Sequence, residues 1–477
     1  MIQELPIFIL GLDAADHLLI ERWAAQGELP AFSRLLDEGS YGILESTARV
    51  FSGSAWISIA TGCNPGKCGV YGRYQIANGT YNVRRIKASD SRVSPFWASF
   101  RGPVAVVDVP KTPLFPDIDG VQLVEWGAYD HYSEFSSMPD HLSARVLDEF
   151  GRHPFLDRDF EVALHGRRDF DALRDLLIQG VKMKGRLNLA LLKTSRFRLF
   201  FSVFGETHAA GHAFWRFQDP RHPRYEPNGP FATALLDVYR AIDGAVGEFL
   251  EELPRDCILL VLSSQGFSLD SMADEDFLCE ILVKTGMSLP RLEKTNYAPY
   301  VPAMNFDMTR TRAFCLPTDL QGYIRINLRG REPDGVVPES EYDSVCRELE
   351  AELLAMRHHK DGASVVREVV RVRDAFKGAF TEELPDLSVV WNTGHIVTEV
   401  ESPGCGLMQR KPDLSAGGGN HRGVGFVLAY GSNVSQGRFA GHVFDIAPTV
   451  GGLLGEARRS EWEGEPLSIP GLRLPGR

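Results

Sequence analysis

Short apolar segments alternate with amphipathic ones along much of the chain. Ile7–Leu10, Phe197–Phe204 and Ile258–Leu262 are mainly apolar runs, which are typical of strands buried on both faces of a parallel sheet. Between the last two, Ala232–Leu250 places apolar side chains on one face at helical spacing and so predicts an amphipathic helix. Strands joined by helices of this length predict a mostly parallel sheet covered on both faces, which is a three-layer α/β/α sandwich.

The remaining pattern divides the chain into a sheet-forming part and an insertion. Within residues 270–382, two short strands at 313–327 are followed by an amphipathic helix at Glu339–His358. We therefore predict a single domain over residues 1–477, with an inserted cap or accessory segment at about 270–382. Outside that segment, further helices and core strands are expected at Leu18–Ala25, Ala31–Glu38, Tyr41–Glu45, Val104–Val109, Val121–Glu125, Leu387–Trp391 and Val424–Ala429.

Composition narrows the classes of function. The chain has 477 residues, of which 44% are hydrophobic, so it can bury a large core. Its formal net charge of −12 argues against a nucleic-acid-binding protein, although a local basic pocket for a small anionic substrate remains possible. No apolar run is long enough to span a membrane, and the first residues lack the basic segment of a signal peptide. The seven cysteines are odd in number and scattered, which predicts reduced thiols and a cytoplasmic location.

A carboxylate and a hydroxyl group lie where an open α/β sheet places its reactive groups. Asp13 follows the first apolar strand, and Ser52 lies just before a short helix. The carboxyl ends of parallel strands form the usual reactive edge, and a helix N-terminus stabilises anions. Asp13 is thus a candidate metal ligand or base, and Ser52 a candidate nucleophile for phosphoryl or sulfuryl transfer. By spacing, Ser54 is either a rival nucleophile or an N-cap of the following helix.

Three histidines are candidate metal ligands. His208 and His212 lie four residues apart just after Phe197–Phe204, so on a helix both imidazoles project from one face. His421 follows a glycine run, which permits close approach of the backbone. Three neutral imidazoles with one open position suit a catalytic zinc ion, so we predict one tightly bound Zn²⁺ per chain. The alternative is that these are polar histidines whose rings bind backbone carbonyl groups.

Four other polar residues each have two interpretations. Glu206 either orients a ligating imidazole or lies on the surface. Asn64 and Lys67 either contact an oxyanion or belong to a turn. Arg325, on a strand with alternating polar side chains, either reaches an anionic substrate or faces solvent at a sheet edge.

The order of these motifs resembles that of the alkaline phosphatase superfamily, and in particular its type I phosphodiesterase/nucleotide pyrophosphatase branch. The resemblance extends over the whole chain. It implies an alkaline phosphatase-like fold and metal-dependent chemistry on a phosphate ester, with the nucleophile at Ser52 and one metal at His208, His212 and His421. The residues that carry it are Gly11-Leu12-Asp13, Leu29-Pro30-Ala31-Phe32, residues 55–70, Glu206-Thr207-His208, residues 262–267, Asn420-His421 and Asp445-Ile446-Ala447-Pro448-Thr449.

The resemblance also implies a second metal site, and there the chain departs from the family pattern. That site combines the carboxylate at Asp13 with an adjacent Asp-His pair, which falls on Ser264 and Gln265 in this sequence. Neither of these neutral side chains is a strong zinc ligand. We therefore predict that a second divalent metal binds poorly or not at all, with Ser264 and Gln265 kept as candidate substrate-binding residues.

Three functions are compatible with this set of residues. The first is a metal-dependent hydrolase or transferase acting on a phosphate ester, which is favoured because Asp13, Ser52 and the three histidine positions are all present. The second is a lyase or group-transfer enzyme of a biosynthetic pathway that works with one metal on the same fold. The third is a degenerate relative that binds a ligand without catalysis. The sequence does not indicate an oligomeric state.

Overall fold

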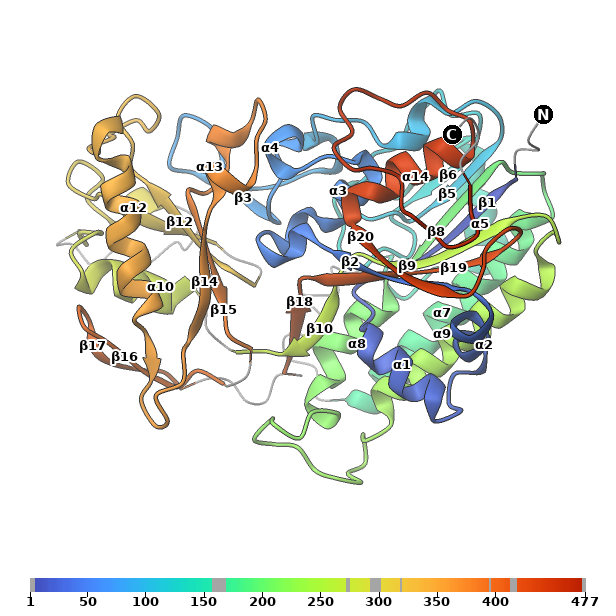
Figure 1. The fold of residues 1–477 in the computed structure, drawn as a ribbon, viewed down its shortest axis with the longest axis horizontal. Coiled ribbons are helices and arrows are strands. Elements are labelled where there is room, and N and C mark those ends of the chain that lie inside the picture. Colours follow the sequence, from blue (N-terminus) through green and yellow to red (C-terminus); the bar gives the residue numbers. More distant parts are fainter. Residues whose placement is uncertain are drawn as a thin grey trace.

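A large twisted sheet forms the centre of the protein (Figure 1). The computed structural model describes residues 5–156, 169–271, 275–291, 302–317, 320–393, 396–411 and 418–473. Within them the strands of this sheet are β1 (Ile7–Leu12), β2 (Ser40–Glu45), β5 (Val104–Val107), β6 (Gly120–Val124), β7 (Ser136–Met138), β8 (Leu199–Phe204), β9 (Ile258–Ser263), β19 (Val424–Gly431) and β20 (Gly437–His442).

The sheet is mostly parallel, as the sequence predicted. Its spatial order is β20-β2-β19-β9-β1-β8-β5-β6-β7. Strands β5, β8, β1 and β9 run parallel to one another in the middle of the sheet, so their carboxyl ends share one edge. Antiparallel pairing is confined to β19 with β2 and β9, and to β6 with β7.

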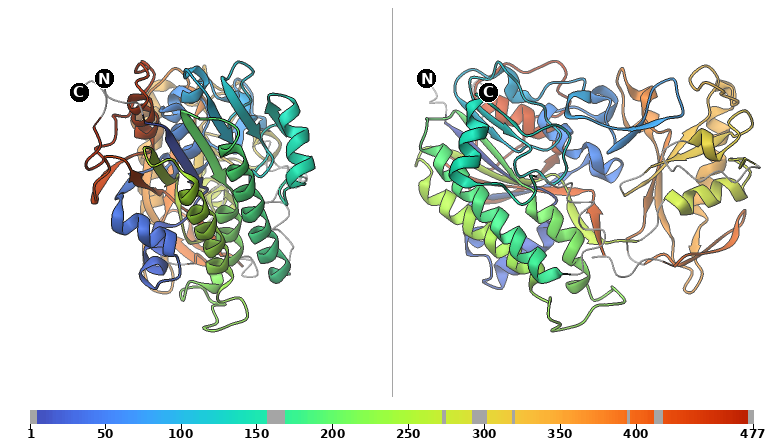
Figure 2. Two further views of the ribbon diagram at one scale, coloured as in Figure 1. Left: turned by 90° about the vertical axis from the view of Figure 1, so that its right-hand side faces the viewer. Right: turned by 180° about the vertical axis from the view of Figure 1, so that it is seen from behind.

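Helices cover both faces of this sheet (Figures 1 and 2). Alternate side chains of β1 enter different cores, with Phe8 and Leu10 on one side and Ile7 and Ile9 on the other. The predicted three-layer sandwich is thus confirmed. The first core is closed by α1 (His17–Ala25), α2 (Pro30–Glu38), α7 (Phe170–Leu192), α8 (Glu206–Phe214) and α9 (Ala234–Glu252), and the second by α3 (Ala55–Thr61) and α14 (Ile446–Leu453).

A second body, which we call the accessory lobe, lies beside the sheet at the left of Figure 1. Its antiparallel sheet has the order β11-β12-β15-β14, and a separate sheet has the order β13-β16-β17. The elements of the lobe are α10 (Glu275–Lys284), α11 (Pro302–Asn305), β11 (Ala313–Leu316), β12 (Gly322–Ile326), α12 (Glu339–Leu354), β13 (Arg357–His358), β14 (Val366–Arg371), α13 (Val372–Ala375), β15 (Leu387–Trp391), β16 (Glu399–Ser402) and β17 (Gly406–Gln409).

One strand lies in a different sheet from the one expected. The sequence placed Leu387–Trp391 back in the central sheet, but the structure makes it β15, in the lobe between β12 and β14. The strand is buried along its whole length, so its pattern alone does not distinguish one sheet core from another. The lobe therefore continues to β17, beyond the boundary expected near residue 382.

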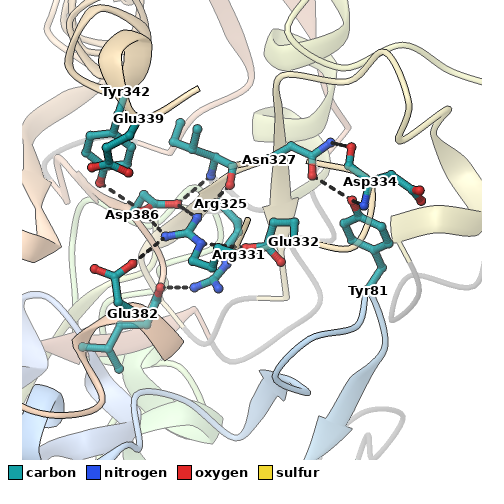
Figure 3. Close-up of polar contacts among 12 residues, drawn as sticks. Tyr81, Arg325, Asn327, Arg331, Glu332, Asp334, Glu339, Tyr342, Glu382 and Asp386 are labelled. Atoms are coloured by element: carbon teal, nitrogen blue, oxygen red, sulfur yellow. Dashed lines mark hydrogen bonds and ion pairs between the residues drawn. The ribbon is translucent and has the colours of Figure 1, made fainter. Parts of the chain in front are cut away.

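The lobe has a buried polar network of its own (Figure 3). Arg325 and Arg331 share the carboxylate of Glu332, at 2.7 and 2.8 Å, and Arg331 also pairs with Asp386 at 2.6 Å. The Tyr342 hydroxyl donates to Asp386 at 3.0 Å. Burial of Asp386 would raise its pKa, but the charge of Arg331 outweighs it and lowers that pKa. Arg325 thus neither reaches a substrate nor faces solvent; it belongs to the interior of the lobe.

Side chains of the lobe pack against Val50 and Phe51, which directly precede Ser52. The ring of Phe51 lies 5.3 Å from that of Tyr323, 5.5 Å from that of Tyr71 and 5.7 Å from that of Phe376, measured between centroids. The Ser388 hydroxyl donates to the carbonyl oxygen of Val50 at 2.8 Å. The elements near this junction and at the sheet edge include α4 (Pro65–Cys68), β3 (Tyr74–Ile76), β4 (Val83–Arg85), β10 (Gly266–Leu269) and β18 (Gly419–Arg422). Helix α5 (His141–Phe150) packs against β7 and α7.

The cysteine prediction was wrong for one pair. Cys279 and Cys315 form a disulfide that joins α10 to β11, whereas the sequence predicted reduced thiols throughout. The scattered spacing that suggested free thiols carries no information on pairing, because the two residues meet only through the fold of the lobe. In the described ranges, no helix combines the length and the apolar character that a bilayer crossing requires.

Candidate active site

Three histidines from distant parts of the chain converge at the carboxyl edge of the parallel strands. His208 and His212 lie on α8, directly after β8, and His421 lies on β18. One ligand atom from each ring lies within 4.8 Å of the others. The two Nε2 atoms of His208 and His212 are 3.1 Å apart. The structure therefore brings together the three candidate ligands as the sequence predicted.

Two glycines allow the helix and the strand that carry these rings to approach. A side chain at Gly211 would lie 2.5 Å from the ring of Phe267, and one at Gly419 would lie 2.2 Å from the carbonyl oxygen of Gly211. The Nδ1–H of His212 donates to the carbonyl oxygen of Gly419 at 3.0 Å. That bond fixes the tautomer with Nε2 as the ligating atom.

Asp13 orients one of the imidazoles. Its Oδ2 accepts a hydrogen bond from Nδ1 of His208 at 2.8 Å, and its Oδ1 accepts one from the indole of Trp56 at 2.6 Å. Thr207 donates to its backbone carbonyl at 2.7 Å. Both carboxylate oxygens are thus engaged, and Asp13 is not part of the group of ligand atoms. A carboxylate on Nδ1 leaves Nε2 of His208 directed at a metal.

The electrostatics of the site suit a cation with neutral ligands. Burial lowers the pKa of His421 well below its ordinary value, and the adjacent rings of His208 and His212 lower it further. The ring is therefore neutral at neutral pH, which is the form that ligates a metal. Its Nδ1 is buried without a hydrogen-bond partner in the described part of the chain. Three imidazoles, one of which has a buried ring nitrogen with no hydrogen-bond partner among the described residues, fit a divalent ion such as zinc.

Ser52 shares a cavity of about 100 Å³ with these rings. Its hydroxyl is buried, and among the described residues it has no hydrogen-bond partner. Ser54, the rival by spacing, donates to the carbonyl oxygen of Phe51 at 2.8 Å and does not line the cavity. Besides Ser52, Gln265 and the histidines, the lining residues are Gly53, Arg73, Lys111, Tyr129, Asp130 and Tyr132.

The sequence interpretation missed five of these lining residues. Lys111 follows β5 and Tyr129, Asp130 and Tyr132 follow β6, at the same edge of the sheet as Asp13. The Tyr129 ring stacks on that of His208, with centroids 3.9 Å apart. Inspecting the polar residues after every predicted strand would have found these four, because parallel strands end at one edge. Arg73 lies in a loop before β3 and carries no such signal.

An ion pair lies at the wall of the cavity. Arg73 pairs with Asp130 at 3.1 Å, and the Tyr132 hydroxyl donates to Asp130 at 3.2 Å. Burial of Asp130 acts to raise its pKa, but the charges of Arg73, His208 and Lys111 prevail and lower it. Asp130 is therefore ionised and holds the Arg73 guanidinium at the cavity wall.

Several other sequence candidates have partners outside the cavity. Glu206 accepts a hydrogen bond from His153 at 2.9 Å, so it orients a histidine that is not in the cluster. Asn64 donates to the carbonyl oxygen of Lys377, and Lys67 pairs with Glu463 at 3.1 Å. The structure thus brings none of the three to the cavity.

Ser264 and Gln265 do lie beside the site, at the end of β9. The Oγ of Ser264 and the Oε1 of Gln265 are buried, and neither has a hydrogen-bond partner among the described residues. Gln265 lines the cavity together with the histidines. Together with the engaged carboxylate of Asp13, this position offers two neutral oxygens where a second zinc site would require charged or imidazole ligands.

Comparison with solved structures supports the fold assignment. A phosphonoacetate hydrolase from Sinorhizobium meliloti 1021, solved with phosphonoacetate, superposes with a TM-score of 0.55 over 93% of this chain and 94% of its own, at 15% identity. The alkaline phosphatase PafA superposes with a TM-score of 0.56 over 98% of this chain and 99% of its own, at 13% identity. A search of curated proteins by sequence found no match.

Fold and site together define an alkaline phosphatase-like phosphoester hydrolase. The model of the family described as type I phosphodiesterase / nucleotide pyrophosphatase matches residues 7–421, well over half of the chain. The chain belongs to this family, and the resemblance inferred from its motifs is confirmed.

Proposed function

We propose that the protein hydrolyses a small anionic phosphate ester with one zinc ion and with Ser52 as the nucleophile. The observation that supports this most directly is that three imidazoles and an unpartnered hydroxyl share one small cavity. Zinc held by His208, His212 and His421 would polarise a phosphoryl oxygen. A cavity of about 100 Å³ suits a phosphoryl group rather than a polymer.

In the proposed reaction, Ser52 first takes the phosphoryl group. A bond forms between Oγ and phosphorus while the bond from phosphorus to the leaving oxygen breaks, and the hydroxyl proton departs with that oxygen as an alcohol. Water then attacks phosphorus, the bond to Oγ breaks, and one proton of the water returns to Ser52. The nearby helix α3 and the cationic wall of Lys111 and Arg73 stabilise negative charge on the transferring group.

Two measurements test this proposal. Metal analysis of the purified chain should give close to one zinc, which His208→Ala and His212→Ala should each release. Turnover of bis(4-nitrophenyl) phosphate should fall by at least about 1000-fold in Ser52→Ala. Brief reaction of the wild type followed by acid quenching should leave a 4-nitrophenyl phosphoryl group on Ser52. Full activity of Ser52→Ala, or no bound metal in the wild type, would overturn the proposal. Ser54→Ala is the matched control and should stay active.

A second candidate is a lyase or group-transfer enzyme that uses the same single metal. The observation that favours it is the incomplete second metal position at Ser264 and Gln265, since hydrolysis in the family pattern involves that position. Product analysis separates the two, because a hydrolase incorporates one oxygen atom from labelled water into its product. The cytoplasmic location stays a prediction, and the Cys279–Cys315 disulfide counts against a reducing compartment.

A further inference from the structure

The position that a second metal would occupy is built from neutral or already engaged groups. Ser264 and Gln265 contribute uncharged oxygens, and the two oxygens of Asp13 bind His208 and Trp56. In the described part of the chain, the carboxylate at this position, that of Asp13, is thus already engaged by two donors. Stabilisation of charge on the Ser52 side of the cavity must therefore come from another cation.

Lys111 lies at that side. Its ammonium donates a hydrogen bond to the carbonyl oxygen of Gly53 at 2.7 Å, so it lies beside the residue that follows Ser52. It also lies 5.0 Å from the centre of the Tyr132 ring, which attracts a cation through its face. These two contacts hold the ammonium at the cavity wall.

The backbone at Lys111 is strained. Its φ is +61°, a left-handed conformation that a residue with a long side chain seldom adopts. Such a conformation is unfavourable and is retained where the surrounding structure fixes it. In this loop it directs a lysine from the end of β5 to the carbonyl group next to Ser52.

Two cations and one carboxylate, those of Arg73, Lys111 and Asp130, line the cavity. Arg73 is paired with the ionised Asp130, and the two cancel to first order. Lys111 adds one positive charge at the same wall. A transferring group with negative oxygens would meet zinc on the histidine side and an ammonium on the Ser52 side.

We propose that Lys111 replaces the second metal ion of this enzyme. Its ammonium stabilises the negative charge that develops on Ser52 Oγ and on one oxygen of the transferring phosphoryl or phosphonyl group. The substrate class is accordingly a small phosphate ester or phosphonate whose transferred group bears at least one ionised oxygen. This inference rests on the proposed function and names the group that completes its site.

The test compares full-length Lys111→Met, Lys111→Arg and Lys111→Ala with the wild type. Lys111→Met should keep one zinc per chain, lose about 100- to 1000-fold in kcat on an aryl phosphate, and bind inorganic phosphate at least about tenfold more weakly. Lys111→Arg should keep a larger part of the activity because it keeps the charge. Added propylammonium should restore part of the activity of Lys111→Ala, which shows that the variant is folded and lacks only the cation. The control Lys193→Met removes an exposed lysine at the end of α7 and should behave as wild type.

The outcomes separate this inference from the proposed function. A wild type whose activity requires a second metal equivalent, or a Lys111→Met enzyme within about threefold of wild type, would overturn the role of Lys111 alone. Full activity of Ser52→Ala, or zinc retained by His208→Ala, would overturn the proposed function whatever Lys111 does.

Discussion

Replacement of Asp13 by asparagine tests the arrangement on which the metal centre depends. The carboxylate receives two hydrogen bonds, from Nδ1 of His208 at 2.8 Å and from Nε1 of Trp56 at 2.6 Å. Both partners are donors when Nε2 of His208 binds a metal. An asparagine can accept from only one of them, because its NH₂ group then faces the other donor. One buried donor is left unsatisfied in either orientation of the amide.

The size of the effect follows from this geometry. Loss of a hydrogen bond to a charged group, with its donor left buried, costs about 1–3 kcal/mol. Groups that orient a ligating histidine in this way change metal affinity by roughly 10- to 100-fold, which corresponds to about 1.4–2.7 kcal/mol. We expect Asp13→Asn to weaken zinc binding by that factor while the stoichiometry stays at one.

The assay is a competition titration of zinc against a chromophoric chelator, together with metal analysis of the saturated protein. Asp243→Asn is the matched control, since Asp243 is a buried carboxylate that accepts from the backbone of Ala31 and Phe32, away from the histidines. It should lower stability but leave zinc affinity unchanged. Two zinc ions in the wild type and one in Asp13→Asn would make Asp13 a metal ligand and refute the reasoning.

Three other changes have expected outcomes. Gly211→Ala inserts a methyl group 2.5 Å from the ring of Phe267 and should weaken zinc binding at least about tenfold in the same titration. Unchanged affinity would mean that α8 and β18 need not approach each other closely for zinc to bind. Burial raises the pKa of Glu125 to about 8, so the folded state holds a proton that the unfolded state releases from about pH 4.5 upward. The free energy of unfolding should therefore fall as the pH rises from about 4.5 to 8, by up to about 1.4 kcal/mol per pH unit. Glu125→Gln should flatten this pH dependence, measured by urea unfolding. An equal pH dependence in both proteins would contradict the raised pKa of Glu125. Arg331→Met removes the ion-pair partner of the buried Asp386 and leaves Glu332 with Arg325 alone. It should cost about 3–5 kcal/mol, measured by the same unfolding method. A loss below about 1 kcal/mol would show that the network in Figure 3 contributes little.

The central fold could be predicted because its signals are local and strong. The run Ile7–Leu10 became β1 and the amphipathic pattern of Ala232–Leu250 became α9, each within a few residues of the expected bounds. Strand Leu387–Trp391 was recognised but assigned to the wrong sheet. Periodicity shows that a strand is buried, whereas the identity of its neighbours depends on contacts between distant parts of the chain.

The sequence predicted those site residues that belong to recognisable motifs. It did not predict the roles that depend on contacts in the folded chain. The three histidines converge as expected, because their residue type and spacing already indicate ligands. The partner of Asp13 depends on a 2.8 Å contact with His208 that no spacing encodes. Lys111 was missed because a lone lysine after a strand is common, and its direction toward Ser52 is set by one backbone angle.

Burial of Phe51 among lobe side chains has a consequence for protein engineering. The ring of Phe51, next to the proposed nucleophile Ser52, packs against Tyr323 of β12, so the lobe helps to fix the position of that serine. A truncated enzyme without the lobe would not be a more permissive version of this one, since its serine would lose its fixed position. Efforts to change the range of accepted substrates should keep the contact between Phe51 and Tyr323 and vary the surface loops beyond it.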